Sequence, residues 1–188
     1  MAVDIFDHQT DIQTNVSPRL LTAVKSMEFA RRYTLSLLED LKDDQWYWTP
    51  SSSTEPKFVS HIAWQAGHIA MAQYGLTLFR QRGREREIDS QLMSSKFRKL
   101  FMRGTQPIDD QAAYPEPNEI LDVMNRVHQQ ALKEIPAFDG DQLDEPLDAP
   151  HAAFATRYGA LLFTSNHEMV HAGQIGMLRR LMGKDPLR

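Results

Sequence analysis

The chain has 188 residues, 41% of them hydrophobic and 24% charged, which is ordinary for one globular domain. Its formal net charge of -4 lacks the basic surplus that favours nucleic acid or an anionic membrane, and we predict neither as a partner. The absence of cysteine excludes disulfides and thiolate metal sites, so any metal must bind to nitrogen or oxygen.

The N-terminal residues 1–11 are mixed and acidic, without the basic start and apolar run of a secretory signal. No apolar stretch approaches the ~20 residues that a membrane helix requires. We therefore expect a soluble, cytoplasmic protein with one domain over residues 1–188.

Four segments carry the apolar spacing of amphipathic helices. The first covers residues 18–41, with Ser17 as the expected N-cap and a proline at the first helical position. A loop rich in serine and proline follows over residues 49–56. The second helix is expected over residues 58–82, and Gly83 would end it.

The stretch from residue 84 to residue 117 is irregular, and its length is typical of a functional or interfacial segment. We expect one short amphipathic helix inside it, on Leu92, Phe97, Leu100 and Phe101.

The last two long helices are expected over residues 117–135 and 154–182, with a polar loop over residues 137–150 between them. Pro136 ends the earlier helix, and Gly183 ends the later one. No strand-like alternation is long enough to compete. Four such helices most simply pack as an all-α four-helix bundle.

The clearest chemical signal is the run HEMVH at residues 167–171. Histidines four positions apart lie one turn apart on the same helix face, so both imidazoles can reach one ion. Both fall in the apolar stripe, where a polar ring is costly unless it is hydrogen-bonded or metal-bound. Two core histidines satisfied by their neighbours are the alternative interpretation.

The same run is the zinc-protease pattern, in which the glutamate is the general base. The extended form of that pattern requires a glycine and a histidine where this chain has Gln174 and Met177. The other form needs a glutamate ligand further on, but only Asp185 is acidic there. We therefore disfavour a protease. Glu168, about 100° round the helix from the first histidine, can be an ordinary solvated carboxylate.

A third ligand must come from upstream of this run. His61 and His68 share a face of the second helix but lie two turns, about 10.5 Å, apart, so they cannot both bind one ion. His8 and His151 fall outside the expected helices, and His128 flanks the stripe of the third helix. Spacing alone leaves the choice between His61 and His68 open.

Three segments resemble the DinB-like (DinB/YfiT) family. They are WTP at residues 48–50, FVSHIAWQAGHIA at residues 58–70, and HEMVHAGQI at residues 167–175 with LRR and a glycine after it. The resemblance covers the whole chain in helix order and spacing, and its specific motifs lie in the second and fourth helices.

Carried over position by position, this resemblance implies the metal ligands His68, His167 and His171. In the family, a histidine before an aliphatic residue in the second helix is the first ligand, and a final His-x-x-x-His-x-Gly-Gln helix supplies the others. Many members have another residue at the position of Glu168, so we assign it no role. The family fold is an up-down-down-up four-helix bundle, often dimeric, so a homodimer is expected.

Three histidines leave one coordination position open, as in catalytic rather than structural zinc sites. The cofactor expected is a divalent transition metal, with zinc or nickel suited to imidazole. The resemblance implies a metal-dependent enzyme that activates a low-molecular-weight thiol or a water, as a thiol transferase or a hydrolase. The alternatives are a metal-binding stress or regulatory protein without turnover, and a bundle with merely structural histidines.

Other residues are candidates for supporting roles. Gln174, three positions past His171, can orient a ligand ring or a bound water, or it can be a packed amide at the core edge. Trp64, one turn before His68, can wall the site or belong to the core. Basic side chains are concentrated around the end of the second predicted helix. They can steer an anionic substrate toward the site or simply form a solvated helix end. They are Arg80, Arg82, Arg84, Arg86, Lys96, Arg98, Lys99 and Arg103.

Overall fold

The structure is a computed structural model that describes residues 16–50, 60–105, 107–108 and 110–187. Most of these residues are helical, which confirms the all-α class. The expected start of the second helix at residue 58 and the candidate ligand His8 lie outside the described residues. No described helix is both long and apolar enough to cross a membrane.

Helix α1 spans Pro18–Leu38, with Pro18 in the first turn. Ser17 occupies the N-cap position as predicted, but its side chain makes no capping bond, and its carbonyl instead accepts from the Leu21 N–H at 3.0 Å. The helix ends three residues before the predicted Leu41, because the chain turns there and brings Asp40 against Arg179 near the end of the last helix.

The second helical segment has three parts. Helix α2 spans Ile62–Tyr74, a π-helical turn covers Gly75–Phe79, and α3 covers Arg80–Arg82. His61 caps α2, because its Nδ1 accepts from the Trp64 N–H at 3.1 Å. Gly83 ends the segment as predicted, with a φ of 80° that favours glycine.

The linker after Gly83 contains two short helices, where one was predicted. These are α4, Arg86–Leu92, and α5, Ser95–Phe101. They are separate because Met93 is extended and Ser94 caps α5, accepting from the Phe97 N–H at 3.0 Å.

Helix α6 spans Pro117–Glu134, close to the prediction, and α7 spans Arg157–Leu181. The predicted polar loop and the predicted first turn of the last helix contain strands β1, Pro146–His151, and β2, Phe154–Thr156, which pair antiparallel. The loop prediction is therefore wrong over residues 146–150, and the last helix begins at Arg157 and not at residue 154. The hairpin is too short to show an alternating pattern, and pairing of the two strands defines it.

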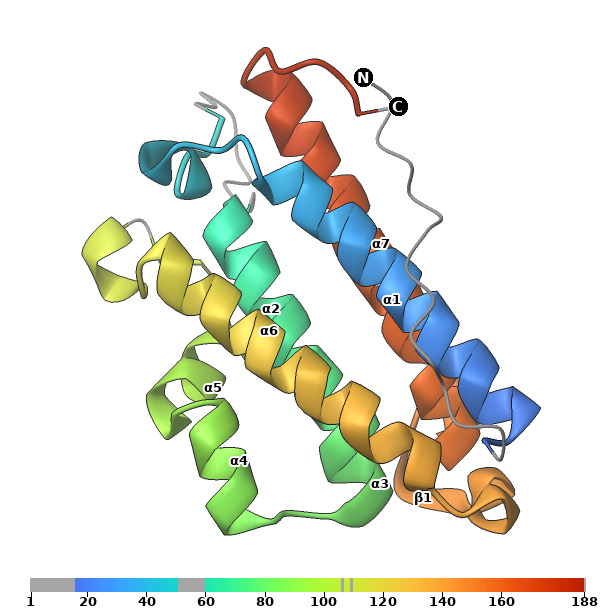
Figure 1. Cartoon of the computed structure of the whole chain (residues 1–188). Coiled ribbons are helices and arrows are strands. Elements are labelled where there is room, and N and C mark those ends of the chain that lie inside the picture. The colour runs from blue at the N-terminus through green and yellow to red at the C-terminus, as the bar shows by residue number, and fades with distance from the viewer. Residues whose placement is uncertain (1–15, 51–59, 106, 109, 188) are drawn as a thin grey trace.

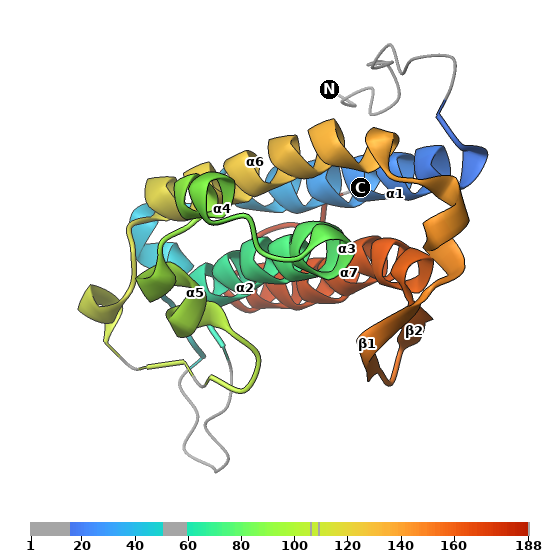
Figure 2. The same cartoon turned by 90° about the horizontal axis from the view of Figure 1, so that it is seen from below.

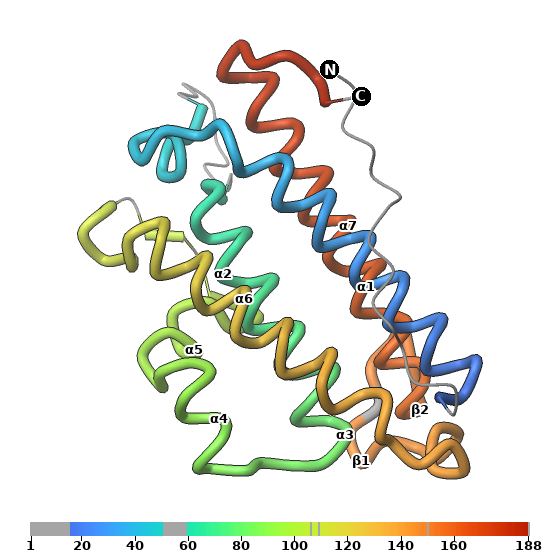
Figure 3. The backbone as a smooth tube through the Cα atoms, viewed as in Figure 1, coloured from blue at the N-terminus to red at the C-terminus, as the bar shows by residue number. Residues whose placement is uncertain are grey.

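Helix α7 packs along α1, and α2 packs against both α6 and α7 (Figure 1). Seen from below, α1 and α6 form one layer and α2 and α7 the other, and the hairpin projects beyond α7 (Figure 2). The tube shows the same order and the α4–α5 segment beside α2 and α6 (Figure 3). The apolar core between the layers includes Met27, Ile69, Met124 and Ile175.

The contact between α5 and α2 depends on Gly67. A Cβ atom on this residue would lie 2.5 Å from Cε1 of Phe101, which is closer than packed atoms approach. Phe101 itself is fully buried. The glycine therefore lets the end of α5 rest on α2 beside His68.

Candidate metal centre

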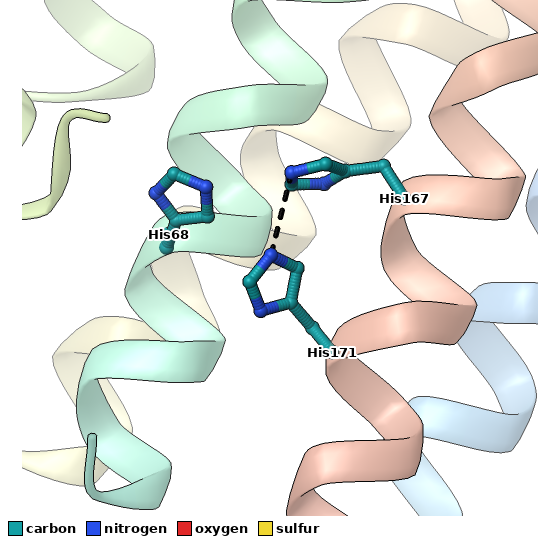
Figure 4. Close-up of side chains that lie close together, drawn as sticks. All are labelled: His68, His167 and His171. Atoms are coloured by element: carbon teal, nitrogen blue, oxygen red, sulfur yellow. Dashed lines mark hydrogen bonds between the residues drawn. The ribbon is translucent and has the colours of Figure 1, made fainter. Parts of the chain in front are cut away.

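Three histidines converge between α2 and α7. His68 projects from the middle of α2, and His167 and His171 project from successive turns of α7 (Figure 4). One ring nitrogen from each lies within 4.8 Å of the other two. His68 and His171 are buried and His167 is half-buried. The structure thus brings together the residues that the family resemblance implies, in a cluster that could hold a metal ion.

The spacing of the ring nitrogens suits a tetrahedral cation. Nε2 of His167 and Nε2 of His171 lie 3.3 Å apart. Two nitrogens at ~2.0–2.1 Å from one zinc ion, at the tetrahedral angle, are separated by about 3.3–3.4 Å. The pair on α7 therefore already has the separation that shared coordination requires.

Hydrogen bonds to Nδ1 set which ring nitrogen can meet a metal. Nδ1 of His68 lies 2.7 Å from the carbonyl oxygen of Phe101, and Nδ1 of His171 contacts Oε1 of Gln65. Both oxygens are acceptors, so each Nδ1 carries its proton and each Nε2 presents a lone pair. Such bonds to the remote nitrogen orient metal-binding histidines.

Burial keeps these rings uncharged at neutral pH. It lowers the pKa of His167 to about 4, with further lowering by His68 and His151. It lowers the pKa of His171 to about 3, with further lowering by His167 and His68. The pKa of His68 is also lowered by burial, against an opposing effect of the Phe101 hydrogen bond. Neutral imidazole is the form that binds metals.

Aromatic rings line two sides of the cluster. Trp64 stacks on His68, with ring centroids 4.8 Å apart and planes 7° apart, and its Nε1 donates to Oγ1 of Thr105 at 3.3 Å. On the α7 side, the Phe163 ring lies 5.7 Å from that of His167. Trp64 therefore walls the site, one of the two roles considered for it.

The remaining described histidines do not join the cluster. His61 caps α2 and packs its ring edge-on against Tyr114, at 4.5 Å between centroids. His128 is buried in the core, where its Nδ1 lies 3.0 Å from Nε2 of Gln73. Of His61 and His68, only the ring of His68 lies beside the two histidines of α7.

Glu168 is not the solvated carboxylate that we considered. It is 2% exposed and forms an ion pair with Arg31 of α1, with Nε and Oε1 2.8 Å apart. Arg31 also donates to Gln73 Oε1 and to the Met124 carbonyl, both at 2.8 Å. Because Glu168 points to α1, its carboxylate serves the core and is not placed as a general base at the histidines.

Some of the basic side chains between residues 80 and 103 form ion pairs within the fold. Arg82 pairs with Asp89 at 2.8 Å and with Glu134 at 2.6 Å, which joins the end of the second helical segment to α4 and α6. Its role is therefore structural. Arg103, by contrast, follows α5 and lies 3.0 Å from His151 in the hairpin.

Gln65, Phe101 and Arg31 support the cluster and its helix, and none of these three roles was predicted from the sequence. Gln65 precedes His68 by three positions, so its place on the same helix face was a usable signal. Nothing local marks Phe101 or Arg31, because their partners lie 33 and 137 positions away. Gln174 is exposed, and its side chain hydrogen-bonds to His171. This hydrogen bond raises the pKa of His171, against the larger lowering caused by burial.

Comparisons with known proteins agree with this architecture. The family model described as the DinB superfamily matches residues 26–175. A solved structure, described as a conserved protein from Enterococcus faecalis, aligns with a TM-score of 0.64 and 16% sequence identity, covering 87% of this chain and 97% of that one. At this identity the likeness shows the fold alone. No curated protein matches the chain.

Proposed function

The chain belongs to the DinB superfamily, and on this premise we propose that it is a metal-dependent enzyme that activates a thiol or a water on a divalent cation. The cation would be held by His68, His167 and His171. The single observation that carries the proposal is the convergence of three ring nitrogens, one from each histidine, within 4.8 Å of one another.

The ligand set supports a catalytic site rather than a structural one. Three neutral imidazoles leave a fourth position of a tetrahedral ion open. A divalent cation supplies Lewis acidity there, which lowers the pKa of a bound thiol or water toward neutrality. Zinc is the first choice and nickel the second, because both suit nitrogen ligands.

The surrounding residues have defined tasks under this proposal. The Phe101 carbonyl and Gln65 hold the rings of His68 and His171 with Nε2 toward the cation. Trp64 and Phe163 flank the histidines with apolar rings and so limit the access of water.

We also propose the up-down-down-up arrangement of the four long helices α1, α2, α6 and α7. Support comes from the pairing of α1 with α7 and of α2 with α6, and from the long linker that precedes α6. This order of helices requires one long connection, between the parallel second and third long helices, α2 and α6.

The metal is tested first. Protein stripped with a chelator is titrated with zinc and with nickel, and metal content is measured after desalting. We expect one equivalent bound, lost in His68→Ala and in His171→Ala. His61→Asn is the matched control, because asparagine preserves the N-cap of α2 and this position lies outside the cluster. Uptake that is absent, or unchanged in the two alanine variants, would overturn the proposal.

Turnover is tested second. The metal-loaded and metal-free proteins are assayed with a panel of low-molecular-weight thiols and electrophiles, and with ester and amide substrates. Metal-dependent product formation is expected. A protein that binds its equivalent of metal but turns over nothing in a broad panel would instead be a metal-binding protein without catalysis.

A further inference from the structure

A series of contacts joins α2 to α7 along one side of the histidine cluster, through the turn after α5 and the hairpin. On the α2 side, His68 is bonded to the carbonyl of Phe101, and Arg103 follows two positions later. On the α7 side, the rings of His167 and Phe163 lie 5.7 Å apart, and those of Phe163 and His151 lie 5.6 Å apart.

Arg103 and His151 join these two sides. Nη1 of Arg103 lies 3.0 Å from Nε2 of His151. Since a guanidinium can only donate, this bond forms in the tautomer that carries its proton on Nδ1, and the Ala153 N–H, 3.2 Å from Nδ1, then has no acceptor there. The turn after α5 thereby meets the tip of the hairpin. Two segments 48 positions apart in sequence are connected beside the cluster.

The charge of Arg103 is not balanced by the fold. Within the described ranges, no carboxylate lies within ion-pair distance of this guanidinium, a property that it shares with other exposed arginines such as Arg84 and Arg86. Its partner in the hairpin is an imidazole, which leaves further guanidinium donors for another acceptor. The side chain is exposed, so a ligand can reach it.

We propose that Arg103, beside His151, is the anion-binding group next to the three-histidine site, and that the ligand of this site carries a carboxylate. The inference rests on the proposed function, since it assumes that the other end of the ligand meets the cation. It adds the substrate class: a small molecule with a thiol or oxygen at one end and a carboxylate at the other.

The chemistry of the site supports an anionic ligand. Three neutral histidines supply no charge to offset a divalent cation, so the site with its metal and Arg103 is strongly cationic. A guanidinium matches a carboxylate in shape, because two parallel N–H groups meet two oxygens. The Phe163 ring, which lies between His151 and His167, provides an apolar contact for the carbon chain of the ligand.

The test uses the full chain loaded with cobalt(II), whose visible absorption changes when a thiolate binds. A series of straight-chain mercaptocarboxylates of increasing length is titrated, each beside the mercaptoalcohol of the same length. At the chain length that spans the site, we expect the carboxylate to bind at least about tenfold more tightly than its alcohol. In Arg103→Ala this preference disappears, and in Arg103→Lys it is intermediate.

Lys99→Ala is the matched control. It removes one exposed positive charge from α5, four positions from Arg103, and should leave the preference unchanged. Cobalt content and circular dichroism are recorded for every variant, so that a loss of fold or metal is seen directly. Arg103 is in an exposed turn, and Arg103→Gln provides a second, polar replacement.

The outcomes separate the two proposals. Wild-type protein that takes up no cobalt would overturn the proposed function and this inference together. Protein that binds cobalt and thiols, but shows no carboxylate preference at any length, or keeps its preference in Arg103→Ala, would overturn this inference and leave the metal site standing.

Discussion

Arg31 of α1 and Glu168 of α7 form an ion pair in the core, with Nε and Oε1 2.8 Å apart and both side chains less than 5% exposed. Glu168 is the neighbour of His167 in sequence, yet it points to the opposite helix layer. The ion pair therefore fixes the rotation of α7 about its own axis. In this rotation, the neighbouring face of α7, which carries His167 and His171, faces α2.

Replacing Glu168→Gln should destabilise the protein by about 3 kcal/mol, because removal of one partner leaves the Arg31 charge buried without its counterion. The free energy of unfolding from urea titration is the measurement. The double variant Arg31→Met/Glu168→Leu should recover part of the loss, since no buried charge remains.

The same variant separates a structural role of Glu168 from a catalytic one. Folded Glu168→Gln should still bind one equivalent of metal. If it were as stable as the parent protein and had lost only turnover, the carboxylate would have to act at the site, against the contacts described above.

The metal-free protein should lose stability as the pH falls from about 6.5 to about 3. The folded pKa values of His167 and His171, about 4 and about 3, lie below the ordinary value of 6.5, so the unfolded chain takes up protons first on acidification. The stabilisation is therefore fully present above pH ~6.5 and is lost progressively below it.

Urea titrations of the metal-free protein at about pH 7 and about pH 5 measure this effect. The double variant His167→Gln/His171→Gln should show a smaller difference between the two pH values, because two of the titrating groups are gone. Equal stability of the unmodified protein at both pH values would contradict the protonation states assigned here.

Replacing Gln65→Leu should weaken metal binding by roughly 10–100-fold, the range usual for loss of a partner that orients a ligand. The leucine fills similar space but cannot accept from Nδ1 of His171. Competition with a chromophoric chelator gives the dissociation constant.

Gln174→Leu is the companion variant, because Gln174 also interacts with His171 but is exposed. We expect a smaller loss of affinity from it, since solvent can replace an exposed amide. A larger loss than in Gln65→Leu would assign the orienting role to Gln174, as the sequence analysis considered.

Replacing Gly67→Ala should destabilise the fold by about 1–3 kcal/mol, because the new Cβ would overlap the Phe101 ring. It should also weaken metal binding, since displacement of Phe101 moves the carbonyl that orients His68. Unfolding free energy and metal affinity are measured on the same preparation.

Gly173→Ala is the control for that experiment. Gly173 lies within α7, and a Cβ there would contact nothing within 4 Å, so alanine should raise stability by about 0.5–1 kcal/mol through helix propensity. Destabilisation by both substitutions would argue against the specific contact between Gly67 and Phe101.

Part of the site was accessible from local spacing. His167 and His171 had to share a face of one helix, because four positions are close to one turn. The same reasoning could not choose between His61 and His68, because the helix predicted over residues 58–82 would place both on one face. The family resemblance selected His68, and the structure agrees, since His61 lies at the helix end and turns toward Tyr114.

The sequence by itself determined the four long helices and the histidine pair on the last one, because apolar periodicity, prolines and capping residues act within a few positions of each other. Only the tertiary structure decided which side of α7 faces α2, that Glu168 meets Arg31, that Gln65 meets His171, and that Arg103 reaches the hairpin. These contacts join residues between 48 and 137 positions apart. They depend on the rotation and offset of packed helices, and no local pattern encodes those.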